Sequence, residues 1–320
     1  MCESPVLLII FNRPSTTERL FDVIRKVQPK RLYIAADAPR ADSPEDKEKC
    51  VYARKLTEQV DWPCEVSRLY QEVNLGCSKG PISAFNWFFS FEDEGIILED
   101  DCLPSVSFFS FCDEMLDRYR NDEKIILVSG CNLGFKLETG YSYGFSGVPN
   151  MWGWATWKRS AMSVDYELKE WKKVNNKLFY TYKAFRQSIF DADLNWYRYW
   201  IDKFDRTVTQ SVITWWDWQW IYYQAKQKKL SIFPAVNLVK NIGFNADATH
   251  TKEDKNPAAN LPFYDLSFPF THPLVKKRDF DYEENCLKWN LFYHKRLPWH
   301  FHIRHSVKMW LIHKLMPNRN

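Results

Sequence analysis

The stretch Gly95-Ile96-Ile97-Leu98-Glu99-Asp100-Asp101 runs from apolar strand residues directly into three carboxylates, and it decides the fold of this 320-residue chain. Other apolar runs of strand length lie at Pro5–Phe11, Arg31–Ala36, Glu65–Tyr70 and Lys124–Ser129, with helical patterns between them. A spacing of about 30 residues from strand to strand is typical of βαβ units. The sequence therefore predicts an α/β fold on a mostly parallel sheet flanked by helices.

The intervening helices have their own signals. The first is expected to open at a capping box, Ser15-Thr16-Thr17-Glu18, and the others to cover residues 42–60, 79–91 and 105–120. Glycines and aromatic residues in 131–157 predict loops and short strands. Helical patterns dominate 161–227, a strand follows at Leu230–Val236, and the prolines of 251–281 predict an extended stretch.

Composition narrows the class of protein. The chain is 45% hydrophobic and 26% charged, as folded proteins are, and its ten glycines form neither G-x-G-x-x-G nor a P-loop. The longest apolar run, Val6–Phe11, is far shorter than a membrane span, and the first residues lack a secretory pattern. Eight scattered cysteines without C-x-x-C favour reduced thiols. We expect a cytoplasmic protein without a dinucleotide or P-loop site.

Charged side chains follow three of the predicted strands. Arg13 comes after the first strand, Asp37 after the second, and the triplet Glu99–Asp101 after the fourth. Ligands of open parallel sheets bind beyond the carboxyl ends of the strands. Three adjacent carboxylates repel one another, and a divalent cation such as Mg²⁺ or Mn²⁺ would relieve the repulsion. The alternative is a solvated acidic loop.

Aromatic segments supply the remaining candidates. Asp217 lies in Thr214–Trp220 among four Trp, and burial among indoles makes a carboxylate a better base. The alternative is an Asp near the start of a core helix. Trp152, Trp154 and Trp216 could stack on sugar rings, the alternative being hydrophobic core. His250, in a loop, could reach a diphosphate or a metal, or simply be exposed.

The C-terminal segment is basic. Residues 285–320 carry seven Lys or Arg and no Asp or Glu. In Trp299–Met316, helical spacing places Trp299, Ile303 and Trp310 on one face, with basic residues beside it. This basic amphipathic helix is expected to bind an anionic membrane surface; the alternative is a helix packed on the domain. No nucleic-acid recognition motif accompanies the charge, so no nucleic-acid partner is expected.

Taken together and in this order, these residues resemble the GT-A nucleotide-sugar glycosyltransferases over about residues 5–245. The order is most similar to the N-acetylglucosaminyltransferase I family and to small bacterial polysaccharide glycosyltransferases. The resemblance implies that Asp101 holds Mn²⁺ or Mg²⁺, that Asp217 is the catalytic base, and that Trp152-Gly153-Trp154 precedes the acceptor region. It also implies a nucleotide-sugar site made of Arg13, Asp37, Glu99, Asp100 and Asp101.

What the resemblance implies is an inverting, metal-dependent transferase. It would move a sugar from a UDP-sugar, expected to be UDP-GlcNAc, to a hydroxyl of a glycan or lipid-linked acceptor in surface polysaccharide synthesis. The protein would lie in the cytoplasm, peripherally on the inner face of the plasma membrane. The expected organisation is a nucleotide-sugar-binding half (1–130), an acceptor and catalytic half (131–250), an extended linker (251–281) and a basic aromatic tail (282–320).

Two other functions stay open. A nucleotidyltransferase of similar fold would use the same nucleotide site and metal, but it is expected to carry a glycine-rich loop after the first strand, and Phe11–Ser15 has no glycine. A non-catalytic, membrane-associated carbohydrate-binding module would keep the aromatic surfaces. Such a module would not need Arg13, Asp37 and the triplet in this order.

Overall fold

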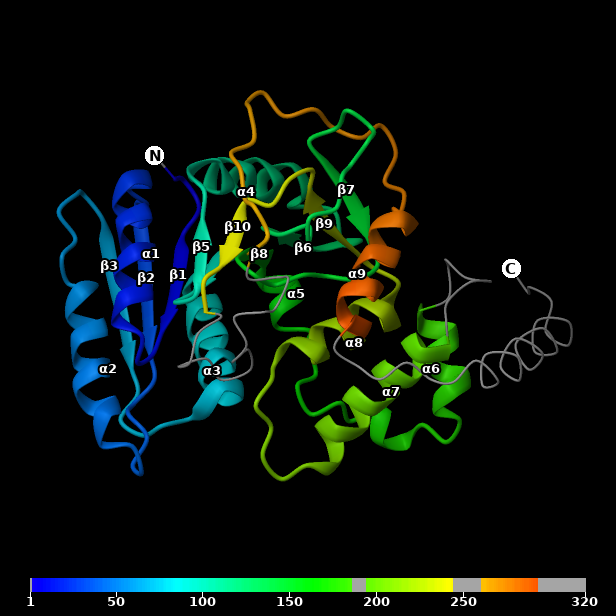
Figure 1. Ribbon diagram of the computed structural model, residues 1–320, viewed down its shortest axis with the longest axis horizontal. Coiled ribbons are helices and arrows are strands. Elements are labelled where there is room, and N and C mark those ends of the chain that lie inside the picture. Colours follow the sequence, from blue (N-terminus) through cyan, green and yellow to red (C-terminus); the bar gives the residue numbers. More distant parts are fainter. Residues whose placement is uncertain (1, 186–193, 244–259, 293–320) are drawn as a thin grey trace, which may run out of the picture.

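The computed structural model describes residues 2–185, 194–243 and 260–292, and its centre is one eight-stranded sheet in the order β3-β2-β1-β4-β8-β6-β9-β7 (Figure 1). Six strands run parallel to one another, and β7 and β8 run against them. The predicted α/β fold with a mostly parallel sheet is confirmed. The strands are β1 Val6–Ile10, β2 Arg31–Ala36, β3 Glu65–Tyr70, β4 Glu94–Glu99, β6 Ile125–Ser129, β7 Tyr143–Ser146, β8 Trp154–Trp157 and β9 Leu230–Pro234.

Helices cover both faces of the sheet because side chains alternate along each strand. Val6 and Leu8 of β1 pack in one core with α1 (Pro14–Val27), α2 (Pro44–Leu56) and α4 (Val106–Tyr119). Leu7 packs in the opposite core with Phe85 of α3 (Gly76–Phe91). The second core also holds residues of α7 (Leu194–Thr209) and α8 (Asp217–Gln227), which lie together with α6 (Lys177–Phe185) in Figure 1. The shorter or later helices are α5 Lys158–Ala161, a 3₁₀ turn at Trp171–Lys173 and α9 Phe280–Phe292.

A second, two-stranded sheet stands at the carboxyl end of β4. It pairs β5 (Cys102–Pro104) with β10 (Val239–Asn241), so that Asn241 lies opposite Cys102. The amide of Ile242 then donates to the Asp101 carbonyl at 2.7 Å. The chain that follows β9 is thereby fixed beside the acidic triplet.

The predicted capping box is wrong. Helix α1 begins at Pro14 with Arg13 as its N-cap, so Ser15 already lies inside the helix, and no side chain of the described residues caps the N-terminus. The hydroxyls of Thr16 and Thr17 instead donate to the Arg13 carbonyl, at 3.2 and 2.8 Å. Proline is favoured in the first turn because its fixed φ suits a helix and its missing N–H is not needed there. The preference for Pro14 in the first turn therefore sets where the helix begins, and not the serine one residue later.

Two predictions fall outside the described residues: His250, and the amphipathic helix over residues 299–316. The domain division at 130, 250 and 281 also stays a prediction. Within the described part of the chain, no helix is both long and apolar enough to cross a membrane.

Candidate active site at the carboxyl edge of the sheet

The carboxyl ends of β1 and β4 are joined by one arginine. Arg13 Nη1 lies 3.0 Å from Asp100 Oδ1 and 2.9 Å from Asp101 Oδ2, and the amide of Phe11 donates to Asp100 Oδ2 at 3.0 Å. Burial favours a neutral Arg13, but the charges of Asp100 and Asp101 outweigh it and raise the pKa of the guanidinium. The structure thus brings together the cation and two of the three acids of the triplet.

Negative charge at this edge exceeds what Arg13 can balance. Burial and the nearby carboxylates of Asp101, Asp100 and Asp217 raise the pKa of Glu99 well above its ordinary value. Burial also raises the pKa of Asp100, to about 6, although Arg13 opposes the shift. Asp100 is buried, whereas Asp101 keeps a fifth of its side chain exposed, at 22%, and Glu99 is also only half-buried. The edge therefore favours further positive charge, and Asp101 is an acid that can reach it.

The carboxylates of the triplet suit an Mg²⁺ or Mn²⁺ ion that takes most of its ligands from a bound substrate. In the described residues, no group of three or more His, Cys, Asp or Glu side chains is arranged to enclose a metal ion. A cation that keeps only one or two protein carboxylates and takes its other ligands from substrate phosphates needs no such group. The carboxylate of Asp101 fits that role, and the metal stays a prediction.

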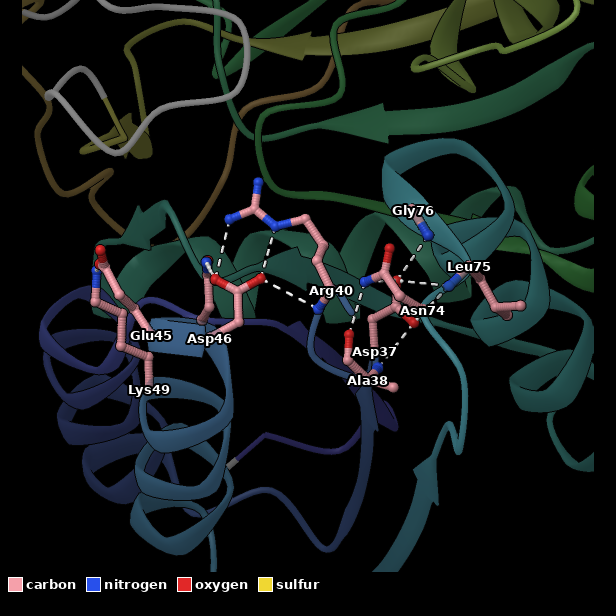
Figure 2. A network of polar contacts seen from close by, with 10 residues as sticks. Asp37, Ala38, Arg40, Glu45, Asp46, Lys49, Asn74, Leu75 and Gly76 are labelled. Carbon is pink, nitrogen blue, oxygen red and sulfur yellow. Dashed lines mark hydrogen bonds and ion pairs between the residues drawn. The ribbon is translucent and has the colours of Figure 1, made fainter. Parts of the chain in front are cut away.

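Asp37 is taken up by backbone donors in the structure. Its Oδ1 accepts from the amides of Ala38 and Leu75, both at 2.9 Å, and its Oδ2 accepts from the amide of Gly76 at 2.8 Å. Asn74 Nδ2 adds a contact to Oδ2 at 3.2 Å. Figure 2 shows this carboxylate facing the first turn of α3. Asp37 thus ties the end of β2 to the start of a helix, and its expected contact with a nucleotide stays a prediction.

A further acid at this edge, Asp46, was not among the candidates predicted from the sequence. Asp46, 1% exposed in the first turn of α2, accepts from Asn12 Nδ2 at 2.7 Å and from Arg40 Nε at 2.6 Å. The hydrogen bonds from Arg40 hold the pKa of Asp46 well below its ordinary value. Figure 2 shows Arg40 reaching from the loop after β2 to this carboxylate, and its guanidinium lies 5.7 Å from the Phe11 ring centroid. One signal was available, an acid in the first turn of a helix.

Asp217 is the first residue of α8. The turn before it is fixed to α3, because Ser78 Oγ donates to the Trp215 carbonyl at 2.8 Å. The carboxylate lies near enough to Glu99 to contribute to the raised pKa of that residue. The fold therefore brings Asp217 to the acidic triplet from more than a hundred residues away.

The three candidate tryptophans separate by burial. Trp154 is 1% exposed and Trp216 6% exposed, and their rings stack on each other at 5.6 Å between centroids. Both rings pack against other aromatic side chains of the described residues, as the hydrophobic-core interpretation predicts, and their contact with a sugar stays a prediction. Trp152 is half-buried beside two cores.

Comparisons with known proteins give distant fold likenesses only. No family model matches the chain, and no curated protein sequence matches it. HddC from Yersinia pseudotuberculosis is 12% identical with a TM-score of 0.30, over 48% of this chain and 77% of that one. Mouse xyloside xylosyltransferase 1 is 9% identical with a TM-score of 0.34, over 70% and 82%. A UDP-glucose pyrophosphorylase is 10% identical with a TM-score of 0.32, over 73% and 90%. Values this low leave the argument about function to the site residues.

Proposed function

We propose that the protein is an inverting, metal-dependent glycosyltransferase that uses a UDP-sugar, with UDP-GlcNAc as the first candidate. The acceptor would be a hydroxyl of a glycan or lipid-linked acceptor in surface polysaccharide synthesis. The observation that carries the proposal is the meeting of Arg13, the acidic triplet and Asp217 at the carboxyl edge of the sheet. A leaving diphosphate needs positive charge, an attacking hydroxyl needs a base, and this edge offers groups for both.

At the donor end, Asp101 would hold Mn²⁺ or Mg²⁺ against the diphosphate. When bound, such a cation stabilises the negative charge that develops on the departing UDP. Arg13 already holds Asp100 and Asp101 in place through its two short contacts. It would keep the Asp101 carboxylate oriented toward the nucleotide and leave the second carboxylate buried behind it.

At the acceptor end, Asp217 would take the proton. The acceptor oxygen attacks the anomeric carbon, the bond from that carbon to the diphosphate oxygen breaks, and the hydroxyl proton passes to the Asp217 carboxylate. One such displacement inverts the anomeric configuration. General-base catalysis of this kind contributes about 10²–10⁴-fold in rate.

A donor panel tests the proposal. Melting temperatures are measured with a set of nucleotide sugars, with and without Mn²⁺, because a ligand that binds only the folded state raises the melting temperature. Release of UDP is then followed with candidate acceptors. We expect Asp101→Asn to abolish Mn²⁺-dependent UDP binding in calorimetry, while Asp93→Asn, at a carboxylate that is 94% exposed, leaves it unchanged. Unaltered Mn²⁺–UDP affinity in the Asp101 variant would remove the triplet as the metal site.

The base is tested separately. Asp217→Asn is nearly isosteric, so we expect transfer to fall by about 10²–10⁴-fold while UDP-sugar affinity stays within a few-fold. Transfer at the wild-type rate would reject Asp217 as the base. Pyrophosphate released from a nucleoside triphosphate, in place of UDP from a sugar nucleotide, would identify a nucleotidyltransferase. Glycan binding without UDP release would identify a carbohydrate-binding module.

A further inference from the structure

Lys203 of α7 is a buried cation in an unusual setting. It is 6% exposed, and its Nζ lies 4.4 Å from the ring centroid of Trp218 and 4.9 Å from that of Tyr199. Another partly buried cation, Arg159, shows the usual arrangement, because it donates hydrogen bonds to the backbone carbonyls of three residues. Within the described ranges, no carboxylate lies at ion-pair distance from the Lys203 ammonium. Aromatic faces attract a cation, but they replace its lost water only in part.

The rings around Lys203 are fixed in place. Trp218 stacks on Trp215 with 4.0 Å between centroids, and Trp215 Nε1 donates to Thr207 Oγ1 of α7 at 2.8 Å. Trp215 is 8% exposed. The stack therefore locks the first turn of α8 against α7. Asp217 stands between the two stacked residues in sequence, so the same lock fixes its backbone relative to Lys203.

Among the described residues, α7 and β4 carry groups whose charges interact with Asp217. On α7, burial and the charge of Arg206 lower the pKa of Lys203, while Asp202 and Asp217 oppose the shift. Burial and the charge of Asp217 raise the pKa of Tyr199, also on α7. Glu99 at the end of β4 adds repulsion toward Asp217. Because an interaction between two charges acts on both partners, the ammonium that Asp217 stabilises also stabilises the ionised Asp217.

We propose that Lys203 is a positioning residue whose buried ammonium, held by Trp218 and Tyr199, keeps the Asp217 carboxylate charged and ready to accept a proton. The inference rests on the proposed function, in which Asp217 is the base. It assigns to α7 the task of supplying a cation that stabilises the ionised base. The N-terminus of α8 acts in the same direction, since it favours a negative charge in its first turn.

Carbon-13 NMR of aspartate carboxyls tests the charge coupling without any activity. The Asp217 signal is identified by its absence in Asp217→Asn, and its titration is followed in the wild type and in Lys203→Met. Methionine fills a similar apolar volume and carries no charge. Removal of a nearby cation should move the Asp217 midpoint upward by about one pH unit. An unchanged midpoint would overturn the proposal whether or not a transferase activity has been found.

Kinetics then separate positioning from mere structure. Because the base must be ionised, Lys203→Met should move the acid limb of the kcat/KM profile upward by about one pH unit. At pH values on that limb, transfer should then be about tenfold slower than in the wild type, with UDP-sugar affinity unchanged. Lys203→Arg should restore the limb. The matched control is Arg206→Met, which removes a more exposed cation from the same Trp stack and should leave the limb in place. Equal shifts in the Met variants, or no rescue by Arg, would overturn the proposal.

Discussion

The pH dependence of folding offers a direct check on the crowded carboxylates. Asp100 has a pKa raised to about 6, against an ordinary value of 3.8, so the folded protein binds its proton more tightly than the unfolded chain does. A carboxyl with a raised folded-state pKa contributes more stability when protonated, and this contribution is lost as the pH rises from about 4 to about 6. Asp100→Asn removes this titration.

The size of the effect follows from the shift. A difference of about two pH units corresponds to about 3 kcal/mol. The advantage of the wild type over Asp100→Asn should therefore fall by about 3 kcal/mol between pH 4 and pH 7. Loss of one charge also weakens the repulsion on Glu99, which adds to the difference in the same direction.

The assay is urea unfolding followed by tryptophan fluorescence at half-unit steps of pH, with the wild type and Asp100→Asn in parallel. The difference between the two free energies isolates Asp100 from acids such as Asp46, whose lowered pKa acts in the opposite direction. Asp93→Asn, at an exposed carboxylate, serves as the control and should give a flat difference. Parallel curves for Asp100→Asn and the wild type would refute the reasoning about the triplet.

Two further substitutions probe the neighbouring loops. Asp37→Ala removes the acceptor that holds the Leu75 and Gly76 amides. We expect its free energy of unfolding to fall by about 2 kcal/mol, with a smaller loss for Asp37→Asn. Equal stability of the wild type and the Ala variant in urea unfolding would contradict this. At Gly243 an added Cβ would come within 2.5 Å of Asp101 Oδ2. Gly243→Ala should therefore displace that carboxylate, weaken Mn²⁺-dependent UDP binding in calorimetry and cost about 1–3 kcal/mol of stability. Unchanged binding would show that the position of the Asp101 carboxylate does not matter for the metal and the nucleotide.

Much of the fold could be predicted because its signals are local. The strands Arg31–Ala36 and Glu65–Tyr70 have the bounds that their apolar runs predict. The start of α3 was expected near Lys79, but it lies at Gly76, where a positive φ of 78° and the carboxylate of Asp37 set the first turn. That contact joins residues 39 positions apart. A pattern within one segment could not have revealed it.

The site was predictable in its residue types more than in its contacts. The rule for ligand positions in parallel sheets placed Arg13 and Asp101 at one edge, and the structure joins them. The first-turn position of Asp46 indicated only an acid favoured at a helix N-terminus, whereas its contact with Arg40 depends on how the loop after β2 folds back. Burial of Trp154 and Trp216 depends on packing between distant elements, which tryptophan content alone does not determine.

The antiparallel strand β8 also has a consequence for how the chain is made. β4 and β6 do not pair with each other in the described sheet; both pair with the four residues Trp154–Trp157. The block β3-β2-β1-β4 can assemble as soon as Glu99 has left the ribosome, but it cannot join the block β6-β9-β7 until β8 and β9 have followed. During synthesis the open edge of β4 is thus an unpaired strand, of the kind that invites aggregation. We therefore expect the growing chain to need protection between residues 99 and 157, and pausing of translation within that window to lower the yield of folded protein.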